Sequence, residues 1–124
     1  MRGTRGGPAA LLLAAALVGA LAGCGAQEPD PEDVAAWRED YCQDLYLWQR
    51  LAHDPPEKGY GNDLVLAASA VVTAAKVLDR HHLDHGGSHV LRDTGDAVSA
   101  NDRYAEGRIS AYCSAVGFET LMKY

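Results

Sequence analysis

Histidine side chains with the chemistry of metal ligands cluster at one place in the chain. Four of the five histidines fall within nine residues, at His81, His82, His85 and His89, and Asp84 lies among them. Imidazole binds Zn, Cu and Ni, and a carboxylate can complete such a site. On a continuing helix His81 and His85 share a face, and Gly86-Gly87 lets His89 fold back toward them. The cluster therefore suggests a divalent transition-metal site, although its spacing matches no established zinc motif.

A solvated helix end is the alternative interpretation of this segment. The negative end of a helix dipole favours cationic side chains, and Arg80 and the histidines follow directly after an apolar helical stretch. The segment is also polar and rich in glycine, as surface loops are. Histidine titrates near physiological pH, so a pH response is a further interpretation of the same residues.

The sequence lacks the motifs that are typical of catalytic sites. The chain has no Gly-x-Ser-x-Gly, no glycine-rich phosphate loop and no His-Glu-x-x-His. Asp40 and Asp44 are four residues apart, like an acid/base pair on one helix face. They fall opposite the apolar face of their helix, which is typical of a solvated surface. We therefore expect that the protein is not an enzyme and has no catalytic residues.

The first 23 residues have the features of a secretory signal peptide. Arg2 and Arg5 precede an apolar run from Pro8 to Ala22, which is shorter than the roughly 20 residues of a transmembrane helix. The run ends in Leu21-Ala22-Gly23-Cys24, which resembles the lipobox of bacterial lipoproteins. The resemblance implies cleavage before Cys24 and a thioether-linked, acylated lipid such as a palmitate-bearing diacylglycerol on its thiol. An uncleaved anchor, or an ordinary signal peptide with a chance cysteine, is the alternative.

Lipidation of Cys24 would attach the domain to the outer face of the cell membrane. Residues 24–30 would then form a tether that spans at most about 25 Å, and residues 31–124 the domain. Loss of the two arginines leaves nine basic side chains against 17 acidic ones, a net charge of −8. Such a surface is repelled by anionic lipid, so the lipid anchor has to hold it at the bilayer. The absence of a basic excess argues against binding to nucleic acid.

Two further cysteines remain in the mature chain. Cys42 and Cys113 are an even pair in an exported protein, which favours a disulfide. Closing a loop of about 70 residues would stabilise the fold by roughly 4 kcal/mol. Two buried free thiols are the alternative. The pair is not a Cys-x-x-Cys motif, so a thioredoxin-like redox role has no support.

The composition and the apolar periodicity predict one small all-α domain. The chain has 124 residues, of which 48% are hydrophobic and 23% charged, an ordinary globular balance. The first helix follows Asp30-Pro31 and stops at His53-Asp54-Pro55-Pro56. The second, capped by Asn62 or Asp63, covers Leu64 to Leu78 and is apolar almost all round, which predicts a buried central helix. The third starts after a Ser88 cap and ends near Gly117, with Phe118 packing back around Cys113.

A disulfide between the first and third helices constrains this layout. In a straight three-helix bundle these helices run parallel, and Cys42 and Cys113 differ in height by roughly 20 Å. Disulfide-bonded Cα atoms lie within about 7 Å of each other. Either the third helix starts well below the first, or it is kinked or broken, and we expect a kink or break between Thr94 and Gly107.

Aromatic side chains indicate both core and surface positions. Trp37, Tyr41 and Trp48 follow the apolar period of the first helix and are expected in the core. Tyr46 and Leu47 fall off that period and are the better candidates for an exposed contact, and a wider apolar face is the alternative for Leu47. Tyr41-Cys42, an alanine-rich middle, and Tyr112-Cys113 followed by Gly117-Phe118 loosely resemble uncharacterised small lipoproteins of high-GC Gram-positive bacteria. That resemblance implies a helical, disulfide-linked, extracytoplasmic domain and no particular activity.

These features predict a membrane-anchored lipoprotein whose helical domain is an interaction or binding module at the cell envelope. Its expected partners are the lipid bilayer, through acylated Cys24, and an unidentified protein. The second hypothesis is a metal-binding lipoprotein that holds Zn, Cu or Ni with the four clustered histidines, and a lipoprotein enzyme is the third. An exposed apolar patch around Tyr46 would favour a partner module, whereas converging imidazoles would favour a metal site. A polar pocket that contains carboxylates with shifted pKa values would favour an enzyme.

Overall fold

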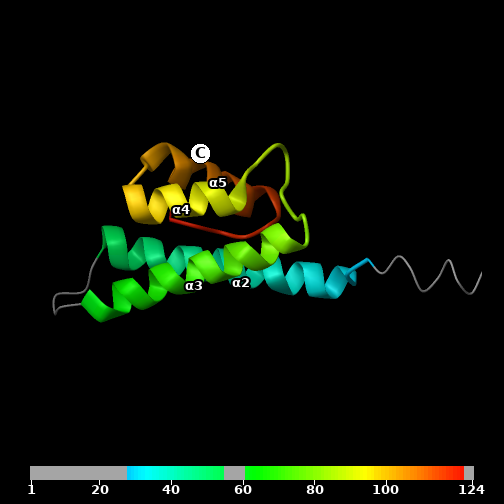
Figure 1. The fold of residues 1–124 in the computed structure, drawn as a ribbon, viewed down its shortest axis with the longest axis horizontal. Helices are drawn as coiled ribbons and strands as arrows, with labels where there is room; N and C mark the ends of the chain where they lie inside the picture. The colour runs from blue at the N-terminus through cyan, green and yellow to red at the C-terminus, as the bar shows by residue number, and fades with distance from the viewer. Residues whose placement is uncertain (1–27, 55–60, 122–124) are drawn as a thin grey trace, which may run out of the picture.

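The computed structural model describes residues 28–54 and 61–121. The signal peptide, Cys24 and most of the tether lie outside these residues. The described chain is helical and contains no strand, with the order α2 (Pro31–His53), α3 (Gly61–Arg80), α4 (Val90–Ala100) and α5 (Arg103–Ala115). Helices α2 and α3 form one layer, and α4 and α5 lie across it as a second layer (Figure 1). The predicted all-α bundle is therefore confirmed.

The number of helices differs from the prediction because the third helix is broken in two. Helix α4 ends at Asn101, whose φ of 54° is left-handed, and Asp102 caps the next helix. Its Oδ1 atom accepts hydrogen bonds from the backbone N–H groups of Tyr104 at 2.9 Å and Ala105 at 3.1 Å. An N-terminal cap of this kind starts a new helix in a new direction. The break lies within the predicted interval, and residues 28–54 and 61–121 form four helices where three were expected.

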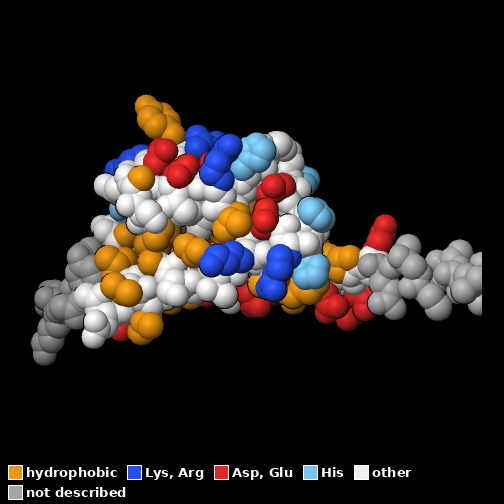
Figure 2. Space-filling model, viewed as in Figure 1, with side chains coloured by type: hydrophobic (Ala, Val, Ile, Leu, Met, Phe, Trp, Pro, Cys, Tyr) orange, Lys and Arg blue, Asp and Glu red, His pale blue; other side chains and the backbone are white. Residues whose placement is uncertain are grey.

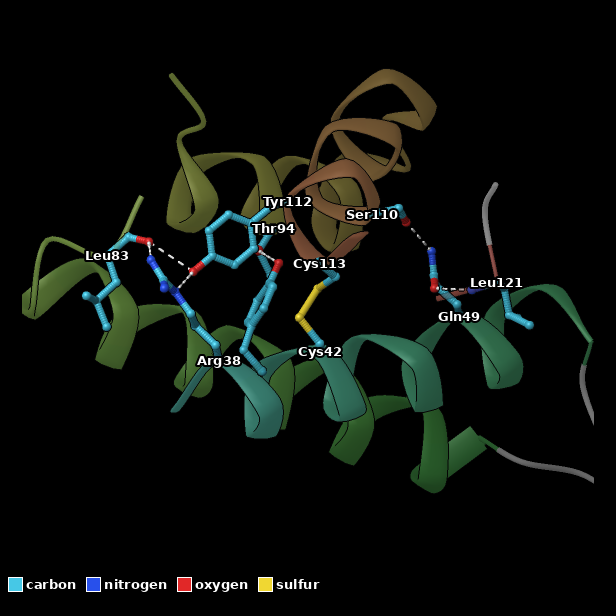
Figure 3. Close-up of a disulfide and its surroundings, with 10 residues drawn as sticks. Arg38, Cys42, Gln49, Leu83, Thr94, Ser110, Tyr112, Cys113 and Leu121 are labelled. Carbon is cyan, nitrogen blue, oxygen red and sulfur yellow. Dashed lines mark hydrogen bonds between the residues drawn. A yellow bond between two sulfur atoms is a disulfide. The ribbon is translucent and has the colours of Figure 1, made fainter. Parts of the chain in front are cut away.

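The break brings the two cysteines together. Helix α5 runs back along α4, so Cys113 reaches the level of Cys42 on α2 (Figure 3). The Cα atoms of Cys42 and Cys113 are 5.7 Å apart and their sulfur atoms are bonded. Both cysteines are buried in the core. The predicted disulfide is thus present, and it joins the two layers.

Helix α3 is not the buried central helix that its composition predicted. Of the other described helices, only α2 and α4 pack against it, so it buries one face, formed by Ala67, Val71, Ala75 and Leu78. Val65 and Leu66 are two-thirds exposed. The prediction was wrong because a near-uniform apolar composition does not show whether neighbours cover one side of a helix or all sides. With 20 residues α3 is long and apolar enough to cross a membrane by length and composition, although only part of it is buried in the domain.

Two predicted helix caps were also wrong. Helix α3 begins at Gly61, so Asn62 and Asp63 lie inside its first turn. Helix α4 begins after His89, and its first N–H group, on Val90, donates to the Asp84 carboxylate at 3.0 Å. Ser88 instead accepts a hydrogen bond from the His85 N–H group at 3.0 Å. A carboxylate six residues away therefore replaces the local cap.

The end of α5 agrees with its sequence signals. Gly117 has a φ of +99°, and its N–H group donates to the Ser114 carbonyl at 3.2 Å. The Phe118 N–H group donates to the Cys113 carbonyl at 2.8 Å, and its ring packs on the core. This pair of bonds is a Schellman ending, which glycine favours because it adopts a positive φ without strain. The last described residues then cross back toward α2.

Candidate functional site

The outer surface of the α2–α3 layer carries a groove. The groove has a volume of about 400 Å³ and runs between the two helices, with Trp37, Asp40, Gln43 and Asp44 on one side and Ala70, Thr73, Ala74 and Val77 on the other. Residues three or four apart on a helix share a face, so both rows follow from the helical period. Small side chains on α3 leave the space that the longer side chains on α2 border.

The charged side chains that line the groove are both acidic. Asp40 and Asp44 lie one turn apart on α2, and no basic side chain is among the lining residues. Partial burial, and then the nearby charge of Asp40, raise the pKa of Asp44 above its usual value. The carboxylates therefore repel each other, and a cation between them would relieve that repulsion. Asp40 and Asp44, which the sequence indicated as a solvated pair, border a groove.

Exposed leucines continue both sides of the groove toward the loop that joins the helices. Leu47 lies one turn beyond Asp44 on α2 and is 51% exposed. Leu66 lies one turn before Ala70 on α3 and is 66% exposed. Figure 2 shows hydrophobic side chains at the surface of the α2–α3 layer toward the end where α3 begins. Because large exposed apolar side chains that lie together mark interaction sites, this surface is a candidate for binding a partner.

The other end of the groove is closed by an aromatic stack. The Trp37 indole and the His81 imidazole lie with their centroids 4.1 Å apart and their planes 12° apart. A second hollow, of about 490 Å³, begins beyond this pair and is lined also by Glu28, Asp30 and Asp33. The acidic character of the groove thus continues past Trp37 to the start of α2.

The clustered histidines do not converge on one point. His81 stacks on Trp37, His82 adopts a left-handed φ of 54°, and His89 precedes the first residue of α4. These three side chains and that of His85 are exposed. Within residues 28–54 and 61–121, no three His, Cys, Asp or Glu side chains meet in a group that could hold a metal ion. Metal binding by His81, His82, His85 and His89 therefore stays a prediction without geometric support in the described residues.

The aromatic residues divide between core and surface as the period indicated, with one difference. Tyr41 and Trp48 are buried, whereas Trp37 is half-buried and lines the groove. Tyr46 and Leu47 are both exposed, as expected. They lie on different sides of α2, because successive residues are about 100° apart around a helix. Only Leu47 lies in line with the groove.

Sequence analysis missed a buried polar cluster at the end of α2. The Glu106 carboxylate is 2% exposed, and both its oxygens lie 2.9 Å from Nε2 of His53. The Gln49 amide donates to Glu106 at 2.9 Å. It also donates to Ser110 at 3.0 Å, and its oxygen accepts from the Leu121 N–H group at 3.1 Å (Figure 3). The signal was present, since Gln49 lies four residues after buried Leu45. Every buried side-chain N or O atom in the described residues has a partner, so these bonds hold the fold together.

A second polar cluster lies on the other side of the disulfide. The Tyr112 hydroxyl donates to the Leu83 carbonyl at 2.9 Å and accepts from Arg38 Nε at 3.1 Å (Figure 3). The Thr94 hydroxyl donates to the Val90 carbonyl at 2.6 Å, so the Tyr41 hydroxyl, also 2.6 Å away, must donate to Thr94. Burial raises the pKa of both tyrosines. Both hydroxyls therefore stay protonated and serve the structure.

Comparison with protein-family models, with curated proteins and with solved structures finds no match to this chain.

Proposed function

We propose that this protein is a lipid-anchored extracytoplasmic lipoprotein whose helical domain binds a protein partner at the cell envelope. The lipobox ending in Cys24 supports the anchor, and the disulfide of Cys42 and Cys113 is in keeping with an oxidising compartment. Two or more acyl chains anchor a protein stably, where one chain would be marginal.

The single observation that carries the binding role is the groove on the outer surface of α2 and α3. It combines two carboxylates, Asp40 and Asp44, with two exposed leucines, Leu47 and Leu66, next in line on the same helices. Exposed leucines beside a carboxylate pair do not stabilise a surface that contacts only water. Apolar contact area with a charged border is the pattern of protein interfaces.

The short tether places this surface near the bilayer. Residues 24–30 would keep the start of α2, at Pro31, within about 25 Å of the lipid, which favours partners in or near the membrane. The acidic groove disfavours direct contact with anionic lipid. The groove therefore suits a protein neighbour rather than the bilayer itself.

Site-specific photocrosslinking in the host bacterium tests the binding role. A photoreactive amino acid at Leu47 should give a discrete crosslinked species in the membrane fraction. The same amino acid at Tyr104, which is 84% exposed on α5 in the other layer, should give none. Crosslinks of equal yield from both positions, or from neither, would refute the proposed binding surface.

A further inference from the structure

We infer that the groove binds a basic amphipathic helix of the partner, whose Lys or Arg side chain lies between Asp40 and Asp44 and whose apolar side chains lie between Leu47 and Leu66. This inference rests on the proposed function, because it names the chemistry of the partner that the same surface would bind. The proposed occupant is a polypeptide segment of the partner rather than a lipid surface or a second copy of this chain.

Charge is the first argument for this occupant. Asp40 and Asp44 are one turn apart on α2, and the raised pKa of Asp44 reflects partial burial and the charge of Asp40. A Lys or Arg side chain would lie between two carboxylates that otherwise repel each other. A second copy of this chain would bring two more carboxylates to the same place, which disfavours self-association through this face.

The shape of the groove is the second argument. A channel between two adjacent helices accepts a third helix in the grooves between their side chains. Ala70, Thr73 and Ala74 on α3 are small and allow a close approach of the helix axes. From Trp37 to Leu47 the groove follows α2 for about 15 Å, which corresponds to about three turns of a bound helix.

The apolar end of the groove defines the register of the occupant. Leu47 follows Asp44 by three residues, and Leu66 precedes Ala70 by four, so the leucines lie one turn from the acidic part. A helix in the groove would place a basic residue and an apolar residue three or four positions apart. Recognition of an amphipathic helix by such spaced anchors is a common binding mode.

Selection from a displayed library of amphipathic helices tests the inference. The target is the chain from residue 24 with Cys24→Ser, which keeps every described residue. Asp40→Asn/Asp44→Asn removes the two groove carboxylates. Asp79→Asn/Glu119→Gln is the matched control, because it removes two exposed acids that do not line the groove. A second pair compares Leu66→Ser with Val65→Ser, which is equally exposed but about 100° away around α3.

We expect selected peptides to be enriched in Lys or Arg three or four positions from an apolar residue. Their Kd should rise at least about tenfold with Asp40→Asn/Asp44→Asn and change less than about twofold with the control pair. Leu66→Ser should weaken binding and Val65→Ser should not. Tryptophan emission should change on binding, and the change should be lost in Trp37→Phe, because Trp37 lines the groove while Trp48 is buried.

Three results would overturn the inference. Enrichment of acidic or uncharged helices, equal weakening by the two acid pairs, or tighter binding to anionic vesicles than to any peptide would each contradict a basic helical occupant. The Leu47 crosslink separates this failure from failure of the proposed function. If that crosslink persists while basic peptides fail, the surface binds a partner of other chemistry. If both fail, the binding role itself is wrong.

Discussion

The imidazole of His81 lies flat on the indole of Trp37, with centroids 4.1 Å apart. This stack places the first of the four clustered histidines against Trp37, at the end of the acidic groove. It gives the histidine segment a structural connection to α2 that its sequence did not indicate. His81 lines the second hollow, beyond Trp37, and whether the histidine segment binds a metal is a direct question for experiment.

Metal titration answers that question. For the Cys24→Ser chain without an affinity tag, we expect no binding of Zn, Cu or Ni tighter than micromolar, because no three ligand side chains converge in the described residues. Calorimetry beside a variant that lacks His81, His82, His85 and His89 makes the measurement. Tighter binding that disappears in the variant would restore the metal-binding hypothesis.

The buried Glu106 carboxylate is expected to be important for stability. Glu106→Ala removes the acceptor of the His53 ring and one of the two acceptors of the Gln49 amide, and we expect it to lower the free energy of unfolding by about 2 to 3 kcal/mol. Urea unfolding followed by circular dichroism measures the loss. Glu119→Ala, an exposed acid, is the control and should change stability by less than about 0.5 kcal/mol. Equal effects of the two substitutions would contradict the buried cluster.

The cap at the start of α5 is expected to contribute separately. Asp102→Ala removes the acceptor for the N–H groups of Tyr104 and Ala105, so we expect a loss of about 1 kcal/mol. Asp102→Asn keeps an acceptor oxygen and should lose less. Thermal and urea unfolding of both variants measure the difference. A cost of Asp102→Asn as large as that of Asp102→Ala would show that capping is not the reason for the effect.

The raised pKa of Asp44 predicts a dependence of stability on pH. A carboxyl group whose pKa is higher in the folded chain than in the unfolded chain binds more protons when folded, so its contribution to stability falls as pH rises through these values. Asp44→Asn should therefore stabilise the free domain at pH 7 and lose this advantage at about pH 3. Asp79→Asn, which replaces an exposed acid outside the groove, is measured in parallel as the control. A gain that is the same at both pH values would refute the electrostatic origin.

The extent to which sequence predicts this fold depends on the kind of interaction. The apolar period of α2 predicted that helix, because periodicity is a local property of the sequence. The distance limit of a disulfide predicted the break in the third helix, because it is a geometric constraint. Several turn-forming residues fell in the interval, so the break at Asn101 could not be chosen among them. The acceptor for the Val90 N–H group was missed because Asp84 reaches it only after the loop has folded.

The groove and the buried polar cluster depend on which helix faces which. Asp40 and Asp44 look solvated on α2 alone, and they border a groove only once α3 lies beside them. Gln49 on α2 and Glu106 on α5 are polar at buried positions, which a helical period treats as surface until the partner helix is placed. The same reason explains the exposure of Leu66, since the composition of α3 does not show that its outer side lacks a neighbour.

The intact mass of the protein purified from the membrane of its host tests the central claim most directly. We expect a chain that begins at Cys24 and carries a diacylglyceryl group with further acyl chains. The protein should leave the membrane fraction when Cys24 is replaced by serine. Protease added to protoplasts or spheroplasts, whose cell membrane is intact, should cleave the protein. A mass that corresponds to all 124 residues, or to a mature chain without lipid, would contradict the account.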